Sequence, residues 1–232
     1  MRFLLFLFLF GNSAIYSYSQ DTSVSSPSFI SDWETGKAKT EIMGVKFTLP
    51  NDFKCYSKWV ETPCFFWLGL DGIVESIDEN VFILFSMPTP YTEKDSVELS
   101  FFFPENRPYL SPNKMHLNTI LSDLARNKGL DIPEARKEIN IQEHVTYYSD
   151  EDAKSAFNAD TVITYDVKIT GLKYSSELAE VINTKKYKHC KALVLQKENR
   201  GFLVMYCFYS NKAKKNIDSY MKSLDSIFRY ED

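Results

Sequence analysis

After residue 40, the apolar residues of this chain come in short runs that stop at proline. The runs over residues 41–50, 80–88 and 96–104 are rich in β-branched and aromatic side chains, and each ends at a proline. Such side chains suit the pleated surface of a sheet, and proline cannot donate to a strand ladder. These runs therefore predict successive antiparallel strands, and residues 142–149 and 160–169 predict two more.

Apolar residues spaced three and four apart predict helices around the later strands. In residues 111–129, Ser111 suits the N-terminal cap and Gly129 suits a left-handed residue that closes the helix. Residues 149–157 predict a shorter helix capped by Ser149.

Residues 211–230 carry the strongest helical pattern in the chain. The predicted buried face is Ile217, Tyr220, Met221, Leu224, Ile227 and Phe228, and the predicted solvent face is Lys214, Lys215, Asp218, Lys222 and Asp225. The fold class that follows is α+β: one antiparallel sheet flanked by helices, with the C-terminal helix packed on the sheet.

Residues 189–208 predict a hairpin with a cysteine near each end. A turn centred between Glu198 and Asn199 would place Cys190 directly opposite Cys207, with both side chains on one apolar face. Opposite cysteines either form a strained cross-strand bridge or remain two buried thiols. Redox or metal chemistry is the less favoured alternative, because no CxxC motif lies at a helix N-terminus to lower a thiol pKa.

The chain has four cysteines, an even number. Cys55 and Cys64 flank a turn that contains a proline and are spaced to close a short loop. An exported protein meets oxidising conditions, which favour bridges. The candidate disulfide residues are therefore Cys55, Cys64, Cys190 and Cys207, with three pairings open.

Residues 1–19 have the three-part pattern of a secretory signal peptide: Arg2, an apolar run over 3–10, and small polar residues up to Ser19. The apolar run is far shorter than the roughly 20 residues that span a bilayer. Cleavage after Ser19 satisfies the small-x-small rule. The protein is therefore expected to be exported to the periplasm or the outside of the cell.

Residues 20–35 are rich in serine and too polar to be buried, which predicts a flexible tether. Residues 36–232 are long enough for one core and predict a single α+β domain. No cysteine precedes Cys55, so the N-terminus offers no acceptor for a lipid anchor. The exported chain is expected to be soluble and to lack a membrane span.

The chain has 27 Lys and Arg against 31 Asp and Glu, a net charge of −4 that becomes −5 when Arg2 leaves with the signal. Nucleic-acid binding normally needs a basic face, so no nucleic-acid partner is predicted. One basic cluster, residues 185–189 with Lys191 behind it, reads as a solvated loop, with an anionic-ligand patch as the alternative.

Motifs for catalysis are missing from the sequence. It contains no GxSxG elbow, no Walker loop and no GxGxxG. His116, His144 and His189 lack zinc-binding spacing. The acidic cluster over 150–152 lacks the glycine and the alternation of a calcium loop and is better explained by a helix dipole. No catalytic, cofactor-binding or metal residue is predicted.

The two ends of the chain resemble a known group. Residues 44–53 read GVKFTLPNDF, and residues 201–230 give a strand, a polar loop and a helix that ends in Ser226, Phe228 and Arg229. These stretches resemble the Mog1/PsbP-like α/β/α sandwich group, and the general texture is similar to uncharacterised secreted proteins of Bacteroidota. The resemblance implies a sandwich fold and a non-catalytic accessory or binding role, and it transfers no functional residue.

Two functions follow as hypotheses. The first is an exported binding or accessory protein whose partner is a protein or another envelope component; the second is an enzyme with a site outside known motifs. A contiguous exposed aromatic patch would support the first, and a pocket with clustered polar groups would support the second. The candidate contact residues, each of which could instead be ordinary core, are Trp59, Phe65, Phe66, Trp67, Tyr147 and Tyr148.

Overall fold

The computed structural model of the protein describes residues 44–55, 60–63, 68–88, 114–169, 186–198, 200–225 and 227–232. The predicted signal peptide, the tether and the strand over 96–104 lie outside these residues. So do Ser111, the side chain of Cys55, and the candidates Trp59, Cys64, Phe65, Phe66 and Trp67. The bridge between Cys55 and Cys64 stays a prediction.

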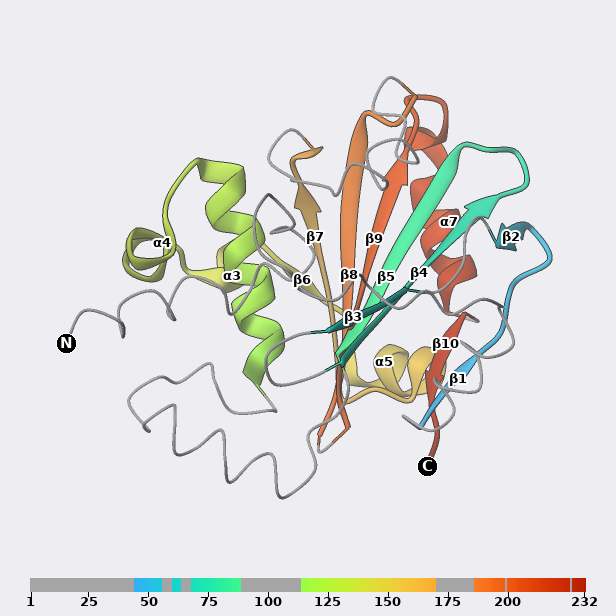
Figure 1. The fold of residues 1–232 in the computed structure, drawn as a ribbon, viewed down its shortest axis with the longest axis horizontal. Coiled ribbons are helices and arrows are strands. Elements are labelled where there is room, and N and C mark those ends of the chain that lie inside the picture. The colour runs from blue at the N-terminus through green and yellow to red at the C-terminus, as the bar shows by residue number, and fades with distance from the viewer. Residues whose placement is uncertain are drawn as a thin grey trace.

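Eight strands of the described residues form one antiparallel sheet (Figure 1). They are β2 Phe53–Cys55, β3 Val60–Pro63, β4 Leu68–Ser76, β5 Val81–Pro88, β6 Thr146–Tyr147, β7 Thr161–Val167, β8 His189–Lys197 and β9 Gly201–Tyr209. Their spatial order is β2-β4-β5-β9-β8-β7-β6, and β3 also pairs with β4. The predicted strands over 80–88 and 160–169 are confirmed. The one over 142–149 is reduced to β6, which follows the 3₁₀ helix η3 Ile141–Glu143.

Helices cover both faces of this sheet, so alternate side chains of a strand enter two different cores (Figure 1). The helices are α3 Met115–Lys128 and α4 Ile132–Glu138 on one face, and α5 Asp150–Phe157 and α7 Ile217–Leu224 on the other. In β5, Phe82 and Leu84 belong to the core under α3, whereas Ile83 and Phe85 belong to the core under α7. The predicted α+β class and the packing of the C-terminal helix on the sheet are confirmed.

Local signals explain the ends of α3 and α5. The N–H of Asp152 donates to the Ser149 hydroxyl (3.1 Å), which confirms the predicted cap, and acidic residues fill the first turn of α5. α3 closes at Gly129, whose φ of +73° is the left-handed conformation expected there. Within the described ranges, no helix combines the length and apolarity that crossing a bilayer requires.

The C-terminal helix is shorter than the apolar spacing predicted. It ends at Leu224, and Phe228 instead begins strand β10 (Phe228–Tyr230), which pairs with β1 (Val45–Phe47). Phe228 packs against Phe47 and Phe85, with ring centroids 5.1 and 4.7 Å apart. Phe228 is buried as predicted, but a pairing with a strand far away in the sequence sets its backbone. Asp225, predicted to face water, is half-buried.

The β8–β9 hairpin is confirmed, but its register differs by one residue from the predicted one. Lys197 pairs with Gly201, the N–H of Arg200 donates to the carbonyl of Lys197 (3.1 Å), and Gly201 has a φ of +86°. Three residues therefore separate the paired ends of the two strands, and the left-handed Gly201 begins β9. The predicted turn, centred between Glu198 and Asn199, required a loop of even length. A slip of one residue moves side chains to the other face.

Cys190 and Cys207 therefore do not face each other. Cys190 pairs with Phe208, and Cys207 pairs with Lys191, so the two thiols enter cores on opposite faces of the sheet. Both are free and buried. The predicted bridge between them is wrong, and the alternative of two buried thiols holds. Burial raises the pKa of both, that of Cys207 to about 12, which leaves them protonated and unreactive.

Candidate functional site

The turn that joins β4 to β5 is held rigidly by its own side chains. The buried Ser76 hydroxyl accepts the N–H groups of Asn80 (3.1 Å) and Val81 (3.0 Å), and the N–H of Glu79 donates to the Ser76 carbonyl (2.8 Å). Glu79 has a φ of +56°, a left-handed conformation that glycine adopts more easily. Such strain persists only where the surroundings determine it, and it often marks functional sites.

Asp78 links this turn to α7 through the hydroxyl of Tyr220. Its carboxylate accepts hydrogen bonds from the Ser76 hydroxyl (2.6 Å), the Asn80 amide (2.8 Å) and the Tyr220 hydroxyl (2.6 Å). Partial burial by itself would raise the pKa of Asp78, but these bonds outweigh it and hold the pKa well below its usual value. The hydrogen bond to Asp78 also raises the pKa of Tyr220 to about 12.

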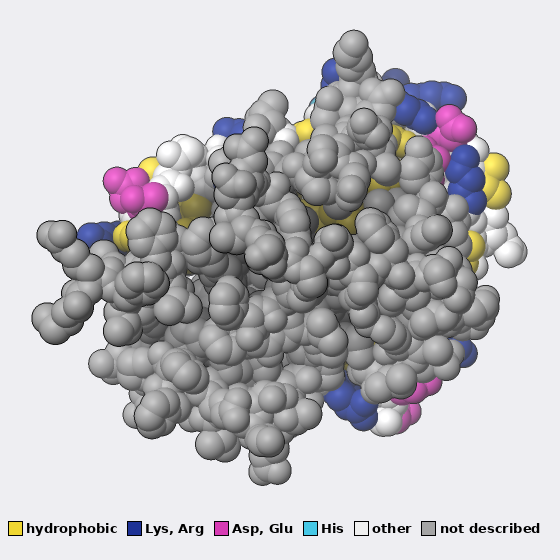
Figure 2. Space-filling model, viewed as in Figure 1, with side chains coloured by type: hydrophobic (Ala, Val, Ile, Leu, Met, Phe, Trp, Pro, Cys, Tyr) yellow, Lys and Arg dark blue, Asp and Glu magenta, His cyan; other side chains and the backbone are white. Residues whose placement is uncertain are grey.

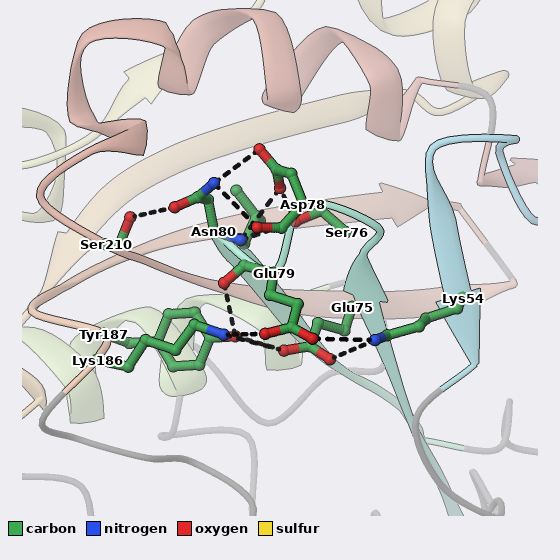
Figure 3. Close-up of polar contacts among 10 residues, drawn as sticks. Lys54, Glu75, Ser76, Asp78, Glu79, Asn80, Lys186, Tyr187 and Ser210 are labelled. Carbon is green, nitrogen blue, oxygen red and sulfur yellow. Dashed lines mark hydrogen bonds and ion pairs between the residues drawn. The ribbon is translucent and has the colours of Figure 1, made fainter.

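A cluster of alternating charges lies beside the turn (Figure 3). The buried Glu75 accepts from the Tyr187 hydroxyl (2.7 Å) and lies 3.4 Å from Nζ of Lys54 and 3.7 Å from Nζ of Lys186. Glu79 lies 3.0 Å from Lys186 and 3.7 Å from Lys54. The hydrogen bond with Lys186 lowers the pKa of Glu79, and the bond with Glu75 raises that of Lys54. The positive charges of Lys54 and Lys186 thus balance the negative charges of Glu75 and Glu79.

Ile77 lies in this hydrogen-bonded turn between β4 and β5 and is exposed to solvent. Ile77 is 62% exposed, although its backbone N–H donates a hydrogen bond to the Asp52 carbonyl (2.7 Å). We call Ile77, Asp78, Glu79, Lys54 and Lys186 the turn surface. The sequence motifs did not single out Ile77. The sequence nevertheless holds one clue: Ile77 is a single apolar residue among the turn-forming residues Ser76, Asp78 and Asn80, between two predicted strands.

A second polar cluster lies inside the protein, between α3 and the sheet. Asp123 is fully buried, and its Oδ2 accepts hydrogen bonds from the hydroxyls of Tyr165 on β7 (2.7 Å) and Tyr206 on β9 (2.9 Å). Its Oδ1 forms an ion pair with Nη2 of Arg126 at 3.0 Å. Burial raises the pKa of Asp123, although Arg126 and both tyrosines oppose the shift. Through these hydrogen bonds, Asp123 connects α3 to strands β7 and β9.

His116, also on α3, makes the stability of the fold depend on pH. The centroid of its ring lies 6.4 Å from that of Phe202, and its buried Nδ1 has no hydrogen-bond partner among the residues that the structure describes. Burial lowers its pKa to about 4, whereas an unfolded chain titrates near 6.5. Between these values the unfolded chain binds the extra proton, so the free energy of unfolding falls as pH drops through this window.

We expect this residue to cost about 3 kcal/mol of stability between pH 7 and pH 4, and we expect His116→Phe to remove that loss. Urea unfolding of both proteins across this range measures the difference. The raised pKa of Asp123 acts in the opposite direction, because a folded state that protonates more easily gains stability as pH falls. Comparing the two proteins cancels that contribution. Parallel stability curves would contradict the assignment.

The structure describes two of the predicted contact aromatics. Tyr147 is 47% exposed on the edge strand β6, whereas Tyr148 is half-buried, with its ring centroid 6.2 Å from that of Phe157. Tyr148 therefore belongs mainly to the core, and Tyr147 remains a candidate. Among the described side chains, no group of three or more His, Cys, Asp or Glu is placed to hold a metal ion.

Comparison with solved structures finds a weak structural similarity between this chain and one known protein. No family model and no curated protein matches the chain. The chain is similar to the solution structure of cyanobacterial PsbP (CyanoP) from Synechocystis sp. PCC 6803, with a TM-score of 0.31 and 12% identity over 91% of this chain and 96% of that chain. The predicted PsbP-like resemblance is thus present at a weak level, from which nothing about function follows. The similarity to proteins of Bacteroidota stays a prediction.

Proposed function

We propose that this protein is an exported binding or accessory protein and that the turn surface contacts its partner. The supporting observation is the exposed Ile77 on a turn whose backbone and neighbours are held by hydrogen bonds and ion pairs. Apolar anchors at the centre of an interface carry much of its binding energy. An anchor that is already ordered loses little conformational entropy when it binds.

Export is the part of this proposal that rests on sequence. The signal pattern over residues 1–19, the flexible segment over 20–35 and the single domain over 36–232 predict an exported, folded unit that a flexible N-terminal segment precedes. The partner in this proposal is a component of the envelope or of the space outside the cell.

The alternative function, an enzyme, has one observation in its favour. α3 carries the ion pair between Asp123 and Arg126 and also the buried His116. However, the Asp123 carboxylate is fully buried and already bound to two tyrosines and an arginine. A substrate could reach it only if α3 moved away from the sheet, so the binding function is the better supported one.

Site-specific photo-crosslinking tests the proposal. A benzoylphenylalanine at position 77 of the exported protein, irradiated in its native envelope fraction, is expected to give one discrete adduct. Excess unlabelled wild-type protein should compete the adduct away, and excess Ile77→Asp should not. The same probe at position 137, an exposed site on α4, is the control. An adduct at position 147 but not at 77 would move the contact to β6, and no adduct at either site would refute the proposal.

A further inference from the structure

We infer that the side chain of Asn127 keeps this protein monomeric by occupying the sheet edge through which two copies of the chain would otherwise pair. The edge belongs to β7, whereas the proposed contact at Ile77 lies between β4 and β5, with β9 and β8 between them in the sheet. Of the strands that the structure describes, only β6 pairs with this side of β7, and it reaches no farther than Thr164. Unpaired strand edges are sites at which proteins associate.

Strand β6 satisfies only the first part of this edge. In an antiparallel sheet, alternate residues of a strand turn their backbone N–H and C=O groups toward the same neighbour. On the β6 side of β7, the Val162 carbonyl accepts a hydrogen bond from the N–H of Tyr148 (3.0 Å), and Thr164 pairs with β6. The next residues with the same orientation are Asp166 and Lys168, which β6 does not reach.

The carboxamide of Asn127, near the end of α3, takes these two positions. Its Nδ2 donates to the carbonyl of Asp166 (2.8 Å), and its Oδ1 accepts from the backbone N–H of Lys168 (2.7 Å). A carboxamide has the donor and the acceptor of a peptide unit, so Asn127 stands in for one residue of a neighbouring strand. Nζ of Lys168 also donates to the backbone carbonyl of Asn127, which holds the last turn of α3 beside this edge.

Without this carboxamide, the edge is complementary to a second copy of itself. An antiparallel pair of β7 strands centred on Val167 places Asp166 of each copy opposite Lys168 of the other. The Lys168 N–H of each copy then donates to the Asp166 carbonyl of the other, so the two groups that Asn127 satisfies are satisfied again. Both side chains are exposed, and they form two cross-strand pairs of opposite charge. Such a symmetric contact closes as a dimer.

The charges beside this edge do not oppose the approach of a second copy. The helix α4, which follows α3, carries Glu134 and Glu138 together with Arg136 and Lys137. Acidic and basic side chains both reach the surface at the left of Figure 2, where Figure 1 places these two helices. A net charge on α4 is therefore not what keeps two copies apart.

Sedimentation velocity and hydrogen exchange of the purified exported protein test the role of Asn127. Wild type should stay monomeric as its concentration rises, whereas Asn127→Ala should form a dimer. In dilute Asn127→Ala, the amide of Lys168 should exchange about tenfold faster than in wild type, and it should regain protection as the dimer forms. The matched control is Asn140→Ala, which removes a carboxamide that donates to Glu143 (3.0 Å) away from any strand edge, and it should remain monomeric.

Charge reversal tests which edge the dimer uses. Added to Asn127→Ala, Lys168→Glu places acids opposite each other and should raise the dissociation constant of the dimer about tenfold. Adding Asp166→Lys as well restores opposite charges across the contact and should restore the dimer. Asp166 also pairs with Lys191 of its own copy, so urea unfolding confirms that each variant is folded. An Asn127→Ala protein that stays monomeric, a wild type that dimerises equally, or a dimer insensitive to these reversals would overturn the inference.

Discussion

Replacing Leu224 with aspartate is expected to abolish the folded state. Leu224 is fully buried near the end of α7, in the same core as Met221 and Phe228. Removing the leucine side chain alone costs about 2 to 5 kcal/mol, and an unpaired carboxylate in this apolar core adds several more. The sum reaches the total stability of an ordinary domain, about 5 to 15 kcal/mol.

Thermal unfolding followed by circular dichroism measures this effect. Ser219→Asp is the matched control, because it introduces the same group at an exposed position of the same helix. It should change the free energy of unfolding by no more than about 0.5 kcal/mol. A Leu224→Asp protein that melts within a few degrees of wild type would mean that α7 does not pack on the sheet through this residue.

Signals within a few residues of each other predicted the fold well. The run that ends at Pro88, the cap at Ser149 and the closing Gly129 are local features, and the corresponding strand and helices are confirmed. Helix and strand periods, together with caps, are physical preferences of short segments. The α+β class followed from them because an apolar face has few ways to be buried.

Features that depend on distant residues could not be predicted in this way. Ile227 and Phe228 continue the helical spacing of α7, but the pairing of β10 with β1 breaks the helix after Leu224. In the β8–β9 hairpin, the left-handed Gly201 pairs with Lys197, one residue away from the predicted register, and this slip places the two cysteines on opposite faces of the sheet. Ile77 became a candidate only when the exposure of its side chain was known.

The buried cluster around Asp123 also joins residues far apart in the sequence, and it carries the second large prediction. Asp123→Ala is expected to lower the free energy of unfolding by about 3 to 5 kcal/mol, because it leaves the Arg126 guanidinium and two tyrosine hydroxyls without this buried acceptor. Urea unfolding at pH 7 measures the loss. A loss below about 1 kcal/mol would show that the cluster does not fasten α3 to the sheet.

Two further variants separate the parts of that loss. Asp123→Asn keeps an oxygen for the hydroxyls of Tyr165 and Tyr206 but removes the charge that faces Arg126, so its cost should be intermediate. Combining Asp123→Leu with Tyr165→Phe and Tyr206→Phe removes the acceptor and both donors together. In the triple variant no tyrosine hydroxyl loses Asp123 as its acceptor, so this variant should be more stable than Asp123→Ala alone. A triple variant that is less stable would mean that the hydroxyls stabilise the fold through partners other than Asp123.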